Sequence, residues 1–199
     1  GYPSDVLNEG DYCVSSNNNL KKYIGWGWRV PIDHTTNTPQ GRYLAFNYGA
    51  NANRTFYQQD IKVEPNKNIT LKYYVYNLEE IGHNTNYPNI RSSFTNKNTG
   101  IEIPTSVKLT GNITGNTSTS NWIEVTHTFN PGTATILTLK FTNVTNHIGG
   151  NDFAIDDILV TQAYDTCTTT LTATVAPKVT QAFAGVTRLI GCGTGANAN

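Results

Sequence analysis

Hydrophobic and polar residues alternate along most of this chain, in short runs that turn signals separate at intervals of about ten residues. Asn-Thr-Gly at 98–100 and Asn-Pro-Gly at 130–132 supply the positive or preset φ angles that tight turns require. No window sustains the i, i+3, i+4, i+7 apolar spacing of an amphipathic helix. The pattern is typical of a β-sandwich.

Several segments alternate as strands do, and weaker candidates lie near Tyr12 and Trp28. The clear segments are Arg42–Tyr48, Thr55–Val63, Ile69–Leu78, Asn89–Phe94, Ile101–Leu109, Trp122–Phe129, Ala134–Thr142 and Phe153–Gln162. In residues 122–129, one face carries Val125 and Phe129, whereas the other is mostly polar, as in an antiparallel strand with one buried face. We therefore expect an all-β fold, a two-sheet antiparallel β-sandwich (jelly roll).

The 199 residues suffice for one such domain with an appendage. The composition changes after Cys167, where a Thr-alternating run leads to Pro177 and a Gly-, Ala- and Asn-rich end follows. We expect a sandwich over residues 1–166 and an extended C-terminal tail over residues 167–199. The tail is either a linker, the start of a following repeat, or a strand donated to a neighbouring molecule, so self-association stays open.

The charge balance argues against nucleic acid as a partner. Lys and Arg number 14, as do Asp and Glu, and no basic stripe collects. No stretch approaches the roughly 18 consecutive apolar residues of a membrane span, and residues 1–4 lack the layout of a signal peptide. We expect no membrane insertion. Asn-rich turns and the absence of Met suit an exported protein, so we expect a secreted, extracellular or bacterial cell-surface location.

The sequence contains no motif of a common enzyme class. Its histidines lie far apart, in none of the spacings that bind catalytic zinc. It has no G-x-S-x-G nucleophile turn and no Gly-rich phosphate loop. We therefore expect no catalytic residues. A pair of carboxylates for glycoside cleavage stays open as a third choice, because such pairs are defined in space.

Three aspartates stand out as candidate metal ligands. Asp156 and Asp157 are neighbours in a strand candidate, so regular alternation would turn one of them toward the core or an adjoining loop. An inward carboxylate needs a cation or several hydrogen-bond donors. Calcium prefers oxygen ligands, and Asp33 and the segment 8–11 offer more of them. The alternative is that these are ordinary solvated aspartates.

Two motifs resemble those of a known group of domains. The first is Asp-His-Thr-Thr at 33–36 followed by Gly-Arg-Tyr-Leu at 41–44, and the second is Asn-Asp-Phe-Ala-Ile-Asp-Asp-Ile at 151–158, closing on Cys167. They resemble MAM domains and the related jelly-roll modules of Bacteroidetes surface adhesins and gliding-motility proteins, which are similar to jelly-roll carbohydrate-binding modules. The resemblance covers residues 8–167.

The resemblance implies a jelly roll with a structural calcium ion and a role in adhesion or glycan binding. At the matching positions, Asp33 and either Asp156 or Asp157 would bind the ion, with Asp157 favoured. Glu9 is a weaker match, and Gly41 would offer its backbone carbonyl.

The cysteine count departs from that family. The chain has three cysteines, so at least one is unpaired within it, and animal MAM domains have more. Under the resemblance, Cys13 with Cys167 is the most economical disulfide, which leaves Cys192 free or intermolecular. Bacterial origin therefore fits better than animal origin.

Exposed aromatic side chains that stack on sugar rings normally mark a glycan site. The chain has 11 Tyr and 3 Trp, of which Trp26 and Trp28 share a face of a Gly-flanked segment. Trp28 and Trp122 are better explained as core residues, because sandwich cores commonly contain a tryptophan. Our candidate ligand contacts are Trp26, Tyr48 and Tyr57.

These expectations combine into one leading hypothesis and one rival. The first is a non-catalytic extracellular adhesion or carbohydrate-binding module, stabilised by calcium, whose partner is a glycan or another host or cell-surface ligand. The rival is a structural spacer or polymerising surface-fibre subunit that assembles through residues 167–199.

Overall fold

The computed structural model describes residues 7–50 and 52–162. They belong to a unit that spans Gly1–Gln162, and Ala163–Asn199 form a second unit. The expected tail, the assembly through it and the partner cysteine Cys167 lie outside the described residues, so these expectations stay predictions.

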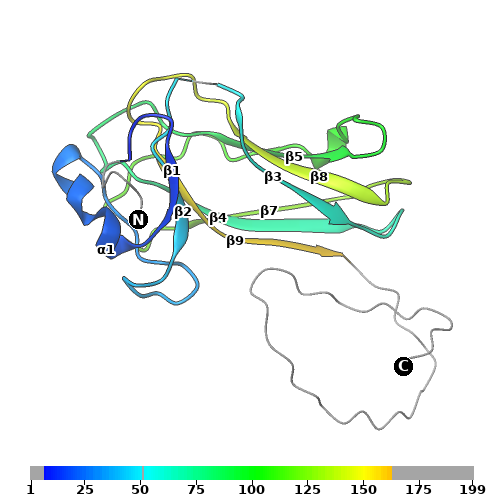
Figure 1. The fold of residues 1–199 in the computed structure, drawn as a ribbon, viewed down its shortest axis with the longest axis horizontal. Coiled ribbons are helices and arrows are strands. Elements are labelled where there is room, and N and C mark those ends of the chain that lie inside the picture. Colours follow the sequence, from blue (N-terminus) through cyan, green and yellow to red (C-terminus); the bar gives the residue numbers. More distant parts are fainter. Residues whose placement is uncertain (1–6, 51, 163–199) are drawn as a thin grey trace, which may run out of the picture. The chain divides into compact units, whose positions relative to one another are not determined.

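Two antiparallel sheets stack as layers in the described part of the chain (Figure 1). One sheet has the strand order β1-β2-β9-β4-β7 and the other β3-β8-β5-β6. The strands are β1 (Tyr12–Ser15), β2 (Tyr43–Phe46), β3 (Thr55–Lys62), β4 (Ile69–Asn77), β5 (Ile90–Asn96), β6 (Lys108–Leu109), β7 (Ile123–Phe129), β8 (Ile136–Asn143) and β9 (Phe153–Gln162). The predicted all-β jelly-roll sandwich is confirmed.

Alternation along the strands builds the core between the sheets. In β4, every second residue from Ile69 to Val75 is completely buried, and the side chains meet those of β8. Members of this cluster include Leu71, Tyr73, Val125, Phe129, Leu139, Phe141 and Phe153. The apolar face predicted for β7 is therefore the buried one.

A second cluster of buried side chains lies around α1 (Asn17–Leu20) and the 3-10 helix η1 (Lys21–Trp26). It includes Tyr76 and Ala154, which alternate along β4 and β9 with members of the first cluster. Trp28 also belongs to it and is 4% exposed, as its interpretation as a core residue predicted. The five-stranded sheet is thus buried on both faces here. These helices were not predicted, because four and six residues are too few to show a helical period.

The segment Ile101–Leu109 is not one strand, contrary to the prediction. Its middle, Pro104–Ser106, forms the 3-10 helix η2, and β6 is limited to Lys108–Leu109. Proline has no backbone N–H for a sheet and favours the first turn of a helix. The weaker strand candidate at Trp28 is likewise reduced to a single bridge with Glu79.

A β-bulge interrupts β9 at Asp157, whose φ is +50°. Lys72 of β4 pairs with Leu159 and Tyr74 pairs with Asp156, so the residue between them on β4 faces two residues of β9. The expectation that only one of the two aspartates turns inward is therefore wrong. Both carboxylates contact the loop that precedes β2.

Candidate binding sites

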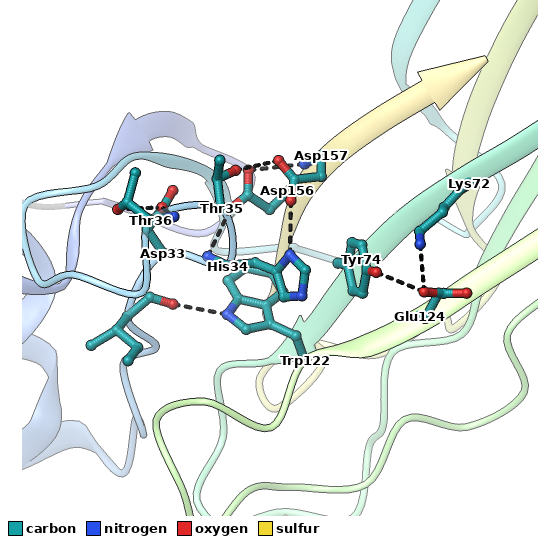
Figure 2. A network of polar contacts seen from close by, with 11 residues as sticks. Asp33, His34, Thr35, Thr36, Lys72, Tyr74, Trp122, Glu124, Asp156 and Asp157 are labelled. Carbon is teal, nitrogen blue, oxygen red and sulfur yellow. Dashed lines mark hydrogen bonds and ion pairs between the residues drawn. The ribbon is translucent and has the colours of Figure 1, made fainter. Parts of the chain in front are cut away.

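Asp156 and Asp157 form a network of polar contacts with the loop before β2 (Figure 2). The backbone N–H of His34 donates over 3.0 Å to Oδ2 of Asp156, and Nδ1 of His34 lies 2.7 Å from Oδ2 of Asp157. The Thr35 hydroxyl donates to Oδ1 of Asp157. Oδ1 of Asp156 accepts the backbone N–H of Asp157 over 2.9 Å. Both carboxylates thus already have donors on each oxygen.

Asp33 belongs to the same loop and is 3% exposed. Its Oδ2 accepts the backbone N–H of Thr36 over 2.6 Å and the Thr36 hydroxyl over 2.7 Å. Gly41 packs directly on it, because a Cβ at residue 41 would lie 2.3 Å from Cβ of Asp33. The loop 33–41 is therefore folded around this aspartate.

The network holds the loop on β9 by protein hydrogen bonds. Burial, and then the negative charges of Asp157 and Asp33, raise the pKa of Asp156 to about 6. Within residues 7–50 and 52–162, no three His, Cys, Asp or Glu side chains come together in a way that could hold a metal ion. The expected ligand Glu9 lies away from this network and lines a different hollow.

Aromatic rings extend the network across the sheet (Figure 2). His34 stacks on Tyr74, with 3.5 Å between ring centroids, and the Trp122 indole N–H donates to a backbone carbonyl over 2.8 Å. The Tyr74 hydroxyl donates to Oε2 of Glu124 over 2.6 Å, and Nζ of Lys72 lies 2.7 Å from the same oxygen. The polar groups of this surface are thus paired with one another.

A second group of carboxylates lines a cavity of about 360 Å³, which we call the acidic hollow. Glu9, Glu79 and Asp152 lie on its wall, and the last two are each 3% exposed. Nδ1 of His83 lies 2.6 Å from Oε2 of Glu79, and the Trp28 indole N–H donates to Oδ2 of Asp152 over 3.2 Å. No Lys or Arg among the described residues lines this hollow.

Asn47 adds an unsatisfied oxygen to the acidic hollow. It is 7% exposed, and its Nδ2 donates to the carbonyl of Leu7 over 2.8 Å, whereas its Oδ1 is buried without a hydrogen-bond partner. Burial, and then the charges of Glu79 and Glu9, raise the pKa of Asp152 to about 8. Buried anionic and amide oxygens together favour a bound cation or bound protons.

A separate cavity of about 230 Å³, the aromatic hollow, lies where β1, β2 and β3 approach one another. Its aromatic lining residues are Tyr12, Phe46, Tyr48 and Phe56, and its charged ones are Asp11 and Arg54. Tyr12 is 66% exposed and stacks on Phe46, with 5.8 Å between centroids. The hollow therefore combines an accessible ring with one carboxylate and one guanidinium group.

The three predicted ligand contacts lie in three different places. Tyr48 lines the aromatic hollow, but is only 6% exposed, and its hydroxyl donates to the carbonyl of Arg54 over 3.2 Å. Trp26 is 60% exposed and lines the acidic hollow. Tyr57 is half-buried in β3, donates its hydroxyl to Gln59 over 2.6 Å, and lines neither hollow.

Most lining residues of the two hollows were not predicted as site residues. They include Tyr12, Phe46, Arg54 and Phe56 in the aromatic hollow, and Asn47, Glu79 and Asp152 in the acidic hollow. Asp11 was considered only within the segment 8–11, as a source of calcium ligands. Each set joins segments that are distant in sequence. One signal was present, since Asp152 precedes the buried run that starts β9 and a charged side chain there needs a partner.

Cys13 lies half-buried in β1 and packs against the second core cluster. Because Cys167 lies outside the described residues, its disulfide with Cys13 stays a prediction. Of the helices that the structure describes, none is long and apolar enough to cross a membrane.

The chain matches no protein-family model and no curated protein sequence. Several solved structures are similar to it. A cyclase from Fischerella sp. TAU aligns with a TM-score of 0.50 at 13% identity, over 82% of this chain and 79% of the cyclase chain. The EclA C-terminal domain, described as a sugar-binding protein, aligns with a TM-score of 0.44 at 14% identity, over 72% of this chain and 96% of that domain.

The CBM22-1 xylan-binding domain of Paenibacillus barcinonensis Xyn10C aligns with a TM-score of 0.40 at 8% identity, over 79% of this chain and 97% of that domain. At such identities a likeness concerns the fold alone. The chain is a jelly-roll β-sandwich that shares its fold with the Fischerella cyclase.

Proposed function

We propose that this protein is a non-catalytic, extracellular carbohydrate-binding module that serves adhesion, and that the aromatic hollow is its glycan site. The observation that carries the proposal is the exposed ring of Tyr12 beside Asp11 and Arg54. Sugar rings present C–H faces that stack on aromatic rings, and hydroxyl groups that pair with charged or amide side chains.

The volume and the charged residues of the aromatic hollow limit which ligands it can bind. Its volume of about 230 Å³ is below the roughly 300–1,000 Å³ of pockets that enclose a drug-sized ligand, so it suits one terminal sugar ring. Asp11 and Arg54 carry opposite charges, which favours a neutral sugar. Glycoside cleavage normally needs two carboxylates across the bond, whereas Asp11 is the carboxylate that lines this hollow.

A calcium ion is part of the proposal, and the acidic hollow suits it better than the Asp33, Asp156 and Asp157 network. In that network, protein donors already occupy both oxygens of Asp156 and Asp157 and Oδ2 of Asp33. In the acidic hollow, Oδ1 of Asn47 has no partner and Asp152 is buried among like charges. Calcium accepts amide oxygens as well as carboxylates.

Glu9 would complete the coordination of that ion. Its side chain is exposed, so it can change rotamer and turn toward the hollow without disturbing packed neighbours. Together with Asn47 and Asp152 it offers the oxygen-rich set that a hard cation requires. The positive charge of the ion would offset the repulsion between the carboxylates when they are ionised.

The glycan proposal is tested by screening the full chain on a glycan array and measuring the affinity of the best ligand by calorimetry. We expect Tyr12→Ala to abolish most of that binding, because it removes the stacking ring. Trp26→Ala is the matched control, since Trp26 is similarly exposed but lies at the other hollow. Loss of binding in the Trp26 variant with full binding in the Tyr12 variant would move the site to the acidic hollow.

A further inference from the structure

We infer that the two hollows are coupled, so that a cation bound in the acidic hollow orders the wall of the aromatic hollow and tightens glycan binding there. The wall consists of two chain segments, Leu7–Tyr12 and Phe46–Tyr48, which line both hollows. The inference rests on the proposed function and adds a means of regulating that site.

The first shared segment contributes successive residues to the two cavities. Asn8 and Glu9 line the acidic hollow, whereas Asp11 and Tyr12 line the aromatic hollow. Gly10 joins them at a φ of +88°, a conformation that glycine adopts without strain. Oδ2 of Asp11 accepts the backbone N–H of Asn8 over 2.9 Å and its side-chain Nδ2 over 3.2 Å. A shift of Glu9 would therefore also shift the carboxylate of Asp11, which lines the aromatic hollow.

The second shared segment alternates between the cavities. Asn47 lines the acidic hollow, and its neighbours Phe46 and Tyr48 line the aromatic hollow. The Tyr48 backbone N–H donates to Oδ1 of Asp152 over 2.9 Å, so a carboxylate of the acidic hollow directly holds an aromatic residue of the other hollow.

Backbone hydrogen bonds lock the two segments together. The N–H of Gly10 donates to the carbonyl of Asn47 over 2.7 Å, and the N–H of Asn47 donates to the carbonyl of Asp11 over 3.0 Å. Side-chain Nδ2 of Asn47 also donates to the carbonyl of Leu7. Asn47 therefore lies between the proposed ion site and the proposed sugar site, and it is hydrogen-bonded to Leu7, Gly10 and Asp11 of the first segment.

This wall is the part of the sandwich that an ion can stiffen. Among the strands that the structure describes, the four-residue β1 lies at the edge of its sheet and pairs only with β2. Glu9, Asn47 and Asp152 line the acidic hollow from separate segments, and Oδ1 of Asn47 is buried there without a hydrogen-bond partner. A cation bound by these oxygens would draw Glu9 and Asn47 toward Asp152. A sugar that binds an ordered wall loses less conformational entropy than one that must order it.

Coupling of this kind is reciprocal. If calcium increases glycan affinity by a given factor, the glycan increases calcium affinity by the same factor. We expect a factor of about tenfold, within the usual range for coupled sites.

The test uses the full chain with calcium chloride alone, and then with the glycan selected on the array. Hydrogen exchange should slow at the amides of Asp11, Tyr12 and Tyr48 when calcium is added in place of EDTA. Glycan affinity should rise about tenfold in calcium. Glu9→Gln should lose both responses, because it removes an ion ligand at an exposed position. Asp60→Asn, an exposed carboxylate variant on the opposite sheet, should keep both.

The outcomes separate the coupling from the proposed function. Equal glycan affinity in calcium and EDTA, or no calcium binding at all, overturns the coupling and leaves the glycan site standing. Unchanged exchange at the three amides while calcium binds overturns it as well. If no glycan binds under either condition, the proposed function fails and the coupling to it fails with it, whereas calorimetry still shows whether calcium binds.

Discussion

The backbone N–H of Tyr48 donates a 2.9 Å hydrogen bond to Oδ1 of Asp152, and this bond joins the segment that follows β2 to the residue that precedes β9. Oδ2 of the same carboxylate accepts the indole N–H of Trp28 over 3.2 Å. Asp152 is 3% exposed, so its charge depends on what shares the acidic hollow with it.

Calcium should stabilise the protein through Asp152. At a calcium concentration 100 times its dissociation constant, the free energy of unfolding should rise by about 2.7 kcal/mol, which melting curves in calcium and in EDTA would reveal. Asp152→Asn should remove most of this response, because the neutral side chain is a poorer ligand. Asp156→Asn should keep it, since the oxygens of Asp156 are used by protein donors.

Coincident melting curves for the unmodified chain would contradict calcium binding altogether. A response that Asp156→Asn removes and Asp152→Asn keeps would instead place the ion on β9 beside His34, as the family resemblance implied.

Gly41→Ala should destabilise the fold by about 1–3 kcal/mol, because the new Cβ would lie 2.3 Å from Cβ of the buried Asp33. Denaturant unfolding of the two chains measures the difference. Gly25→Ala is the matched control, since a Cβ at Gly25 meets nothing within 4 Å. Equal stability of the Gly41 variant would show that the loop 33–41 moves aside without cost.

The strands were predictable because their signal is local. Alternation identified β9 with both ends correct, since each residue's face follows from its neighbours. The bulge at Asp157 was not predictable in this way, because it depends on the register with β4. The short helices near Leu20 were also missed, since their burial comes from packing on the sheet.

The sites were only partly predictable because they join distant segments. Tyr48 and Glu9 were named from the sequence, but their partners Tyr12 and Asp152 were not. Exposure separates a ligand contact from a core residue, and exposure is set by tertiary packing. Trp28 shows this, since the sequence allowed it either as a core residue or as a ligand contact, and the structure buries it and bonds its indole to Asp152.

Stability should fall as the pH rises from about 4 to 6, and Asp156 should contribute to this fall. Folding raises the pKa of Asp156 from 3.8 to about 6, so the folded chain holds this proton where the unfolded chain has lost it. The resulting stabilisation is complete below the unfolded pKa and is lost as the pH rises through the folded pKa. Melting midpoints across this window, in EDTA, measure the effect.

Asp156→Asn should make that part of the pH profile shallower, because the amide does not titrate, whereas Asp152, whose pKa is raised to about 8, still contributes a decline there. Asp60→Asn should leave it in place, since a hydrogen bond from Lys97 lowers the pKa of Asp60 and gives it the opposite pH dependence. A decline of equal slope in the Asp156 variant would assign the effect to other carboxylates, such as Asp152.

Asp11→Asn should weaken glycan binding about tenfold, which corresponds to about 1.4 kcal/mol. Oδ2 of Asp11 already accepts two hydrogen bonds from Asn8, which fix the carboxylate at the wall of the aromatic hollow. Its other oxygen then remains as an acceptor for a sugar hydroxyl, and a bond to a charged acceptor contributes about 1.5–3 kcal/mol.

Affinity should also change little between low and high salt, because a neutral sugar gains no long-range attraction from Asp11 or Arg54. Calorimetry on Asp11→Asn and on Asp60→Asn, each at two salt concentrations, checks both expectations. A steep loss of affinity with salt in the unmodified chain would instead identify a charged glycan held by Arg54.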